Sequence, residues 1–309
     1  MIEFFSYMGT VSFQVLILFI MIAVGFIISK AKMINENGAA QITNILLYIV
    51  TPCVIISSFE CMEFNENSVN ELLISAACAV FTHIIGFILG ALIFRKKEKS
   101  TRTTLICTVA LSNCGFMGIP MTEALLGSHG VFLVSVYLAI FNIFVWTVSY
   151  SMFGGKFSIK SVLVNPGVIG TAIGFAIFFA KLKLPDVISI PVGYMSSLNT
   201  PLAMIVIGYY LSCAPFSLKK SDLPMLVSVL VRLIAVPLIC LAIFRCIGMT
   251  GTLLTSCVIP AAAPSAAIVM MFASKFKADT LTASKGMAFS HVISIITMPL
   301  ILTICSLFA

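Results

Sequence analysis

The sequence predicts an all-α polytopic membrane protein, and three observations support that prediction. Apolar residues make up 60% of the 309 residues and only 9% are charged, whereas about 25% are charged in ordinary soluble domains. The mean hydropathy of +1.15 excludes a water-soluble globule. Because barrel strands alternate apolar with polar residues, the long continuous apolar runs indicate spanning helices.

Ten apolar stretches follow one another, each close to the roughly 20 residues that cross a bilayer as a helix. No segment remains between them for a soluble domain. The first stretch is not expected to be a cleaved signal peptide, because Glu3 is the only early charge and the apolar run is too long. The predicted spans cover residues 11–29, 41–59, 70–94, 103–124, 130–153, 162–181, 190–212, 223–245, 250–273 and 280–307.

Basic residues predict the orientation, since loops rich in Lys and Arg stay on the cytoplasmic side. With both termini extracellular, most of the 18 basic residues fall in cytoplasmic segments, and the loop after span two carries glutamates and no base. We therefore expect a multi-pass plasma-membrane protein. The net charge of +7 implies no nucleic-acid partner, because the anionic inner leaflet attracts such loops. The cytoplasmic bases are Lys30, Lys32, Arg95, Lys96, Lys97, Lys99, Arg102, Lys156, Lys160, Lys219, Lys220, Lys275, Lys277 and Lys285.

Five spans per half would make a duplicated chain a 5+5 inverted repeat, because the second copy enters the membrane from the other side. Thr51-Pro52 in span two and Thr200-Pro201 in span seven are separated by the same spacing as His83 in span three and Arg232 in span eight. Residues 1–155 are thus predicted to form the first five-helix repeat, and residues 156–309 the second, inverted one.

Spans four and nine carry helix-breaking residues near their centres. They read Ser-Asn-Cys-Gly-Phe-Met-Gly-Ile-Pro over 112–120 and Pro-Ala-Ala-Ala-Pro-Ser over 260–265. Glycine weakens a helix and an interior proline breaks its hydrogen-bond ladder, so each motif alone is also compatible with a structural kink. Interrupted helices in both halves point to a transporter's binding site, where the N-terminus of a new half-helix attracts an anion. The amides expected to be free belong to Met121, Thr122, Ser265 and Ala266.

At span four the chain resembles the auxin efflux carrier family, which includes plant auxin exporters and bacterial malate and malonate permeases. The run that carries the resemblance is Asn113-Cys114-Gly115-Phe116-Met117-Gly118-Ile119-Pro120. The resemblance extends over the full length and implies the inverted-repeat fold of bile-acid symporters and sodium/proton antiporters, with helices four and nine crossing at their breaks. It also implies a scaffold domain, a moving transport domain and an organic anion at the crossing.

The resemblance assigns substrate binding to Asn113, with Pro120 and either Pro264 or Pro260 as the crossover prolines. Arg232 is a further candidate, because an arginine at membrane depth usually faces a partner or a water-filled cavity, and its guanidinium suits a carboxylate. Bracing of the two domains by bonds to unwound carbonyls is the alternative for Arg232. The predicted substrate-binding residues are Asn113, Gly115, Pro120, Met121, Pro264, Ser265 and Arg232.

Coupling to H⁺ or Na⁺ has its own candidates. His83 and His291 titrate near neutral pH, and Glu123 follows the fourth-span break. Packing histidines and an interfacial glutamate are the alternatives. A sodium site could use Asn44, Thr51, Asn199 or Thr200, which equally could satisfy backbone groups freed by the prolines. We expect no metal site and no cofactor, since the ten cysteines form no CxxC pair.

Two functions remain open. The first is a secondary active transporter of small organic anions that works by alternating access and carries mono- or dicarboxylates such as malate, malonate or auxin-like carboxylates. The second is a non-transporting membrane receptor or sensor that binds a carboxylate on the same fold. An enzyme is not expected, because the chain has no GxSxG or HExxH motif. Gly86-x-x-x-Gly90 and Gly170-x-x-x-Gly174 allow close helix packing within the fold or in a homodimer.

Overall fold

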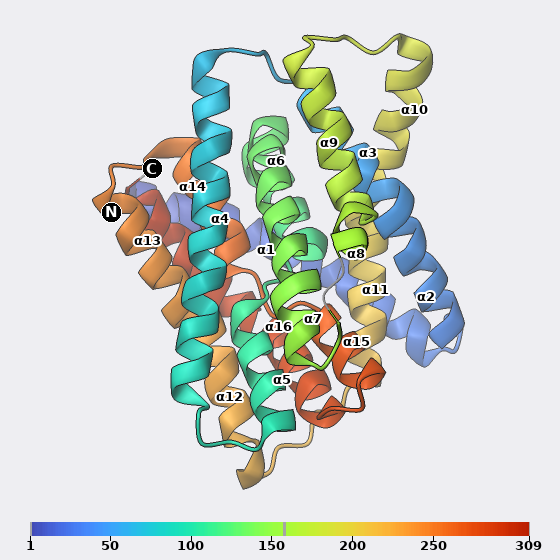
Figure 1. The fold of residues 1–309 in the computed structure, drawn as a ribbon, viewed down its shortest axis with the longest axis vertical. Helices are drawn as coiled ribbons and strands as arrows, with labels where there is room; N and C mark the ends of the chain where they lie inside the picture. The colour runs from blue at the N-terminus through green and yellow to red at the C-terminus, as the bar shows by residue number, and fades with distance from the viewer. Residues whose placement is uncertain (1, 157–158, 309) are drawn as a thin grey trace.

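The computed structural model describes residues 2–156 and 159–308 as helices joined by short loops (Figure 1). Among these residues there is no strand, and a single antiparallel bridge joins Ser112 to Ser265. Seven of the described helices are long and apolar enough to cross a membrane, and two shorter apolar helices cover Pro166–Phe179 and Gly251–Ala262. The prediction of an all-helical polytopic membrane protein is confirmed at this level.

Several of the long helical segments consist of two or three consecutive pieces. In chain order the elements are α1 (Ile2–Lys30), α2 (Glu36–Ile45), the π-turn η1 (Leu46–Val50), α3 (Thr51–Glu60), α4 (Glu66–Ile93), α5 (Lys99–Ala110), the π-turn η2 (Cys114–Gly118), α6 (Ile119–Phe144), the π-turn η3 (Val145–Ser149), α7 (Tyr150–Met152), α8 (Ile159–Leu163), α9 (Pro166–Phe179), α10 (Asp186–Ser197), α11 (Asn199–Cys213), the 3-10 turn η4 (Lys220–Asp222), α12 (Leu223–Leu230), the π-turn η5 (Val231–Ala235), α13 (Val236–Cys246), α14 (Gly251–Ala262), α15 (Ile268–Lys275) and α16 (Thr280–Ser306).

Three of the π-turns accommodate prolines inside otherwise continuous helices. Each ends two residues before a proline, namely Pro52, Pro120 or Pro237. In each case the N–H that follows the turn donates to the carbonyl five residues earlier. Because a proline has no N–H and its ring clashes with the carbonyl four residues back, the wider turn relieves both problems. At Thr51-Pro52 the helix therefore continues through a wide turn.

The helices form two groups. The panel group contains α1, α2, α3, α9, α10 and α11, in which α1 packs along α11 and α3 along α9. The crossing group contains α4, α5, α6, α12, α13, α14, α15 and α16, in which α4 packs on α5 and α14 packs on α6 and α16.

Glycines bring the paired helices close together within the fold. A Cβ atom on Gly86 would lie 2.8 Å from the Cα of Ala110, and one on Gly170 would lie 2.9 Å from the Cα of Pro52. Gly90 approaches the backbone of Ile106 in α5, and Gly174 approaches the Phe59 side chain of α3. Both small-residue motifs are thus used for internal packing.

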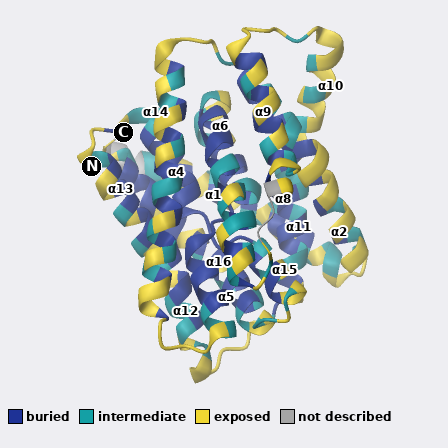
Figure 2. Cartoon of the chain, viewed as in Figure 1, coloured by how far each residue is buried: buried dark blue, intermediate teal, exposed yellow. Residues whose placement is uncertain are grey.

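Exposed positions occur along the outer helices (Figure 2), and large apolar residues occupy many of them. Val187 of α10 is 79% exposed and Ile27 of α1 is 63% exposed. Such outward-facing apolar helices are expected where lipid replaces water. The arginine- and lysine-rich connection after α4 and the glutamate-rich connection after α3 lie at opposite ends of the molecule (Figure 1).

Candidate functional site

Two interrupted helices cross at the centre of the crossing group. The chain leaves helical geometry between α5 and η2 and again between α14 and α15. The N–H of Asn113 donates to the carbonyl of Pro264 at 2.6 Å, and the N–H of Ala266 donates to the carbonyl of Leu111 at 2.9 Å. These reciprocal backbone bonds fasten the two breaks to each other.

The breaks differ in detail from the predicted ones. The second half of the fourth-span helix starts at Cys114, because π-turn η2 carries the chain past Pro120 without a break. Met121 and Thr122 consequently lie inside a helix and do not begin one. The expected free amides are also absent at the other break, since Ser265 N–H donates to Ser290 Oγ at 3.1 Å and Ala266 N–H to Leu111.

The proline at the second break is Pro264. Its carbonyl accepts from Asn113, whereas Pro260 lies inside α14, near Gly118. Pro264 does not start the new half-helix, because α15 begins at Ile268. Ser265 and Ala266, which follow Pro264, pair with the residues around Ser112 before the chain turns into α15.

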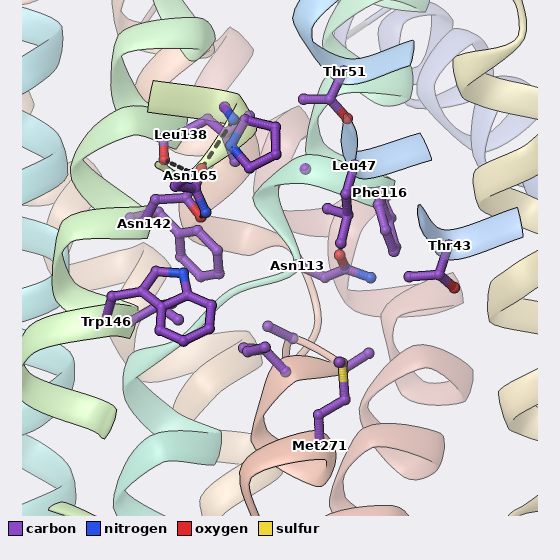
Figure 3. Close-up of a pocket in the computed structure, with 18 of the residues that line it drawn as sticks. Thr43, Leu47, Thr51, Asn113, Phe116, Leu138, Asn142, Trp146, Asn165 and Met271 are labelled. Carbon is purple, nitrogen blue, oxygen red and sulfur yellow. Dashed lines mark hydrogen bonds between the residues drawn. The ribbon is translucent and has the colours of Figure 1, made fainter. Parts of the chain in front are cut away.

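A cavity of about 350 Å³ lies beside the crossing, between the two helix groups (Figure 3). Asn142, Trp146 and Asn165 line one side, and Leu47, Asn113 and Phe116 face them. No lining residue is charged. The complete lining is Thr43, Leu47, Tyr48, Thr51, Asn113, Gly115, Phe116, Leu138, Phe141, Asn142, Val145, Trp146, Val164, Asn165, Pro166, Gly167, Tyr210, Ala266, Ala267, Ile268 and Met271.

Both half-helices that start at the breaks direct their N-termini at this cavity. Gly115 and Phe116 belong to the first turn after Asn113, and Ala267 and Ile268 stand at the start of α15. The first N–H groups of a helix lack partners within it, and the helix dipole makes this end positive. The cavity therefore has a positive polar end without a positively charged side chain.

Asn113 connects the cavity to a buried histidine. Its side-chain oxygen accepts from the N–H of Phe116 at 3.3 Å, and its Nδ2 lies 3.1 Å from Nε2 of His291. Nδ1 of His291 lies 2.8 Å from the carbonyl of Met287. Because that carbonyl only accepts, Nδ1 carries the proton, and Nε2 accepts from the amide of Asn113. His291 is 1% exposed and does not line the cavity, and Asn113 lies between the two.

Sequence reasoning missed the pair of amide side chains in the cavity wall, Asn142 and Asn165. Asn165 donates from Nδ2 to Oδ1 of Asn142 at 3.2 Å and caps the start of α9 by accepting from the N–H of Gly167 at 2.9 Å. Asn142 in turn donates to the carbonyl of Leu138. The available signals were the Asn-Pro step at residues 165–166, typical of a helix start, and an isolated amide within span five.

Arg232 lies away from the cavity and braces the opposite side of the crossing. It is fully buried, and its guanidinium donates to the carbonyl of Val109 at 3.0 Å and to those of Ala110 and Ala261. These carbonyls belong to the last turns of α5 and α14. A helix C-terminus leaves carbonyls unsatisfied and favours a cation, so Arg232 caps both helices at once.

Of the remaining candidates, only Thr51 lines the cavity. His83 lies 2.6 Å from the carbonyl of Ala79 and stacks on Phe144. Exposed positions are occupied by Glu123 in α6 and Asn44 in α2. The last two, Asn199 and Thr200, lie at the start of α11, and both amide atoms of Asn199 are buried without a hydrogen-bond partner among the described residues.

A helical membrane protein with a ligand-sized cavity at two crossed helix breaks has the architecture of a membrane transporter. Comparison with known families gives the same class: the chain belongs to the membrane transport protein family, whose profile matches residues 10–158 and 153–302. The resemblance to the auxin efflux carrier family, based on the residues around Asn113, is thereby confirmed.

Two similar proteins are uncharacterised archaeal transporters. The protein from Methanocaldococcus jannaschii is 24% identical over 303 residues, which cover 93% of this chain and 96% of that one. The protein from Methanothermobacter thermautotrophicus is 24% identical over 302 residues, 95% and 98% of the two chains. Auxin efflux carrier component 3a of Oryza sativa subsp. japonica is 23% identical over 140 residues, 44% of this chain and 23% of the rice protein. The family and these names point to a transporter and not to an enzyme.

Proposed function

We propose that this protein is a secondary active transporter of small organic anions that binds its substrate in the cavity beside the crossing. The observation that carries the proposal is the convergence of two helix N-termini and the Asn113 amide on one uncharged cavity. This arrangement offers N–H groups to a carboxylate while leaving no fixed charge to hold it permanently. A carrier requires such reversible binding.

The cavity favours a monocarboxylate with an apolar body over malate or malonate. Its walls include Leu47, Phe116, Leu138, Trp146 and Met271, and it has no Lys or Arg. A second carboxylate would be buried without a cationic partner, which is costly. The volume of about 350 Å³ falls in the usual range for small-molecule sites. An aromatic acid of the auxin type fits these requirements.

The proposed architecture is ten spans in a 5+5 inverted repeat. The helix over Cys114–Met152 has 39 residues, and at 1.5 Å per residue a straight helix of this length would extend about 58 Å, nearly twice the bilayer core. Gly127 interrupts it with a φ of 61°, where two helices meet. Counting this segment as two spans raises the seven long candidate spans to eight. The helix α9 and the α14–α15 pair bring the number to ten.

Alternating access would then move the crossing group against the panel group. The cavity has walls from both, because Thr43, Leu47 and Asn165 come from the panel side, whereas Asn113 and Met271 come from the crossing side. Sliding of one group past the other opens the cavity to one face and then to the other. In a plasma membrane, the basic connections would face the cytoplasm and both termini the outside.

Protons are the proposed coupling ion. A doubly protonated His291 would have two N–H donors and could no longer accept from Asn113. The Asn113 amide would then turn its oxygen to His291 and give up the bond that it accepts from the Phe116 N–H. The NH₂ group and the released N–H could then both donate to a carboxylate in the cavity. Proton binding at His291 and anion binding in the cavity would therefore reinforce each other. Of the sodium candidates only Thr51 lines the cavity, which gives sodium too few ligands there.

The test is flux into liposomes that contain purified protein. Labelled indole-3-acetate and labelled malonate would be compared with an inward proton gradient, with an inward sodium gradient and with neither. We expect indole-3-acetate to enter faster than malonate, and the proton gradient to accelerate it. Asn113→Ala should lower this flux at least about tenfold, as expected for a ligand hydrogen bond in a desolvated site. Asn199→Ala, which removes an amide outside the cavity, is the control.

Three results would contradict the proposal. Equal flux of both acids would contradict the argument that the uncharged cavity favours a monocarboxylate. Saturable binding without any flux, in protein that melts cooperatively, would favour a receptor on the same fold. Acceleration of the flux by the sodium gradient alone would show that protonation of His291 does not drive transport.

A further inference from the structure

A second cavity lies at one end of the molecule, where the α4–α5 hairpin meets the residues after α7. Its volume is about 460 Å³, and three basic side chains line it: Arg95, Lys99 and Arg102. The other lining residues are Ala91, Thr103, Ile106, Ser151, Met152, Phe153 and Gly154. The cavity shares no lining residue with the one at the crossing.

The hairpin itself explains why these charges converge. A Cβ atom on Gly90 would lie 3.0 Å from the Cα of Ile106, so α4 and α5 are in close contact there. Arg95 follows Gly90 after little more than one helical turn, and Arg102 precedes Ile106 by one turn. Lys99 and Arg102 are three residues apart and share one face of α5. The three cations are therefore brought together at one end of this helix pair.

No acidic side chain of the described residues forms an ion pair with this cluster. The two ion pairs formed in residues 2–156 and 159–308 join His129 to Glu71 and Lys285 to Asp222. The carboxylate of Asp279, which contacts α5, already accepts from the Thr101 hydroxyl and from Thr282. Three bases that share a cavity without a counter-ion repel one another, so an anion placed between them would be stabilised.

The start of α5 adds further donors to the same place. Glu98 precedes the helix without a side-chain hydrogen bond to it, so the first N–H groups of α5 stay unsatisfied by a cap. Lys99 is the first residue of this helix and lines the cavity. A helix N-terminus next to two arginines and a lysine is suited to a phosphate group, whose oxygens accept several charge-assisted hydrogen bonds.

We propose that this cavity is a binding site for a phosphate group, and specifically for the headgroup phosphate of an anionic phospholipid. Leu92 and Ile93, which directly precede the cluster, are 62% and 44% exposed and give an acyl chain an apolar path along α4. A basic pocket between spanning helices at the cytoplasmic surface is suited to anionic lipid headgroups. A soluble phosphate compound has the same chemistry but makes no use of the apolar path.

The same connection offers a matched control. Lys96 and Lys97 are exposed, carry the same charge and do not line the cavity. Non-specific attraction to an anionic leaflet would depend on all of these bases alike. Specific binding in the cavity would depend on Arg95 and Arg102 and not on Lys96 and Lys97.

The experiment compares lipid retention by native mass spectrometry. Wild type, Arg95→Gln/Arg102→Gln and Lys96→Gln/Lys97→Gln would each be released from micelles that contain phosphatidylglycerol or phosphatidylcholine. We expect wild type and the lysine variant to retain phosphatidylglycerol. The arginine variant should retain about tenfold less, since each lost base weakens attraction to an anionic headgroup. Phosphatidylcholine should be retained weakly by all three. Thermal melts of each variant verify folding.

A second arm identifies the source of the phosphate. Inorganic phosphate and pyrophosphate would be titrated in a thermal-shift assay with neutral detergent. Stabilisation that requires Arg95 and Arg102, without retention of phosphatidylglycerol, would keep the phosphate site and replace the lipid by a soluble ligand. Equal losses in both double variants would overturn the proposal, as would the absence of both lipid retention and stabilisation. None of these readouts depends on carboxylate transport.

Discussion

The two sides of the helix crossing are formed by opposite kinds of helix end. On the cavity side, the helical turn after Asn113 and the start of α15 provide helix N-termini, and no charged residue lines the cavity. On the other side, the last turns of α5 and α14 expose carbonyls, and Arg232 occupies the space between them. The buried charge of Arg232 thus lies between two helix ends and not in the cavity.

This difference shows how a membrane protein can hold a buried charge and an anion site close together without combining them. If Arg232 faced the cavity, a carboxylate would bind it strongly and leave slowly. Because the carbonyls of both helices use its donors, the cavity keeps only the weaker positive ends of helices. The predictions below test this division, from the largest expected effect to the smallest.

Replacing Arg232 should have the largest effect, and it should be on stability. Arg232→Met leaves carbonyls at two buried helix ends without partners, so we expect the free energy of unfolding to fall by about 3 kcal/mol. The measurement is the melting temperature in detergent, followed by size-exclusion chromatography. Arg245→Gln is the control, since Arg245 also bonds a carbonyl, that of Met249, but at a partly exposed end of the molecule. A stable Arg232 variant with impaired ligand binding would place the guanidinium in the substrate site.

A negative charge on the other side should destroy binding without unfolding the protein. Asn113→Asp would place a carboxylate between the two helix N-termini, where it competes with the substrate. Like charges in contact cost several kcal/mol, so we expect carboxylate affinity to fall about 100-fold in a binding assay. Asn44→Asp adds the same charge at an exposed position outside the cavity and should have no effect. Equal losses in both variants would show that the effect is a general electrostatic one.

His291 should have an intermediate effect that depends on pH. His291→Phe removes the acceptor of Asn113, and we expect a three- to tenfold loss of affinity, about the value of one hydrogen bond. His291→Gln can still accept from Asn113 and should retain binding while losing its pH dependence. The measurement is carboxylate affinity between pH 5 and pH 8, with His83→Gln as a control at a buried histidine that does not contact Asn113. An unchanged pH profile in His291→Gln would contradict proton coupling through this residue.

The smallest effect is expected at Glu123. This side chain is exposed and lies outside the cavity, so Glu123→Gln should change the proton-driven flux less than about twofold. Uncoupling by this substitution would require a proton path from Glu123 to the crossing that the cavity does not provide.

The sequence was most informative where the structure depends on local chemistry. The prolines and glycines of spans four and nine located both breaks to within a few residues, because these residues disturb a helix wherever they occur. The exact start of each half-helix was not predictable in the same way. At Pro120 a π-turn absorbs the disturbance, and at Pro264 backbone pairing with Asn113 delays the next helix.

The contacts of the site were less accessible from the sequence because they join distant segments. Asn113 and His291 are 178 residues apart, and Arg232 bonds carbonyls that no side-chain pattern marks. Periodicity also could not decide between neighbours on α2, where Thr43 lines the cavity and Asn44 is exposed. The rotation of a helix about its axis is set by tertiary packing, and one step along the chain turns a side chain by about 100°.

The paired backbone bonds between the two breaks have a mechanical consequence. Because Asn113 and Ala266 each donate across the crossing, neither broken helix can shift alone without rupturing bonds in a medium that offers no water as a substitute. We therefore expect the crossing to resist local shifts, and any large rearrangement to occur at the contact between the panel and crossing groups. Its barrier should then depend on lipid and on side-chain shape more than on the breakage of backbone hydrogen bonds.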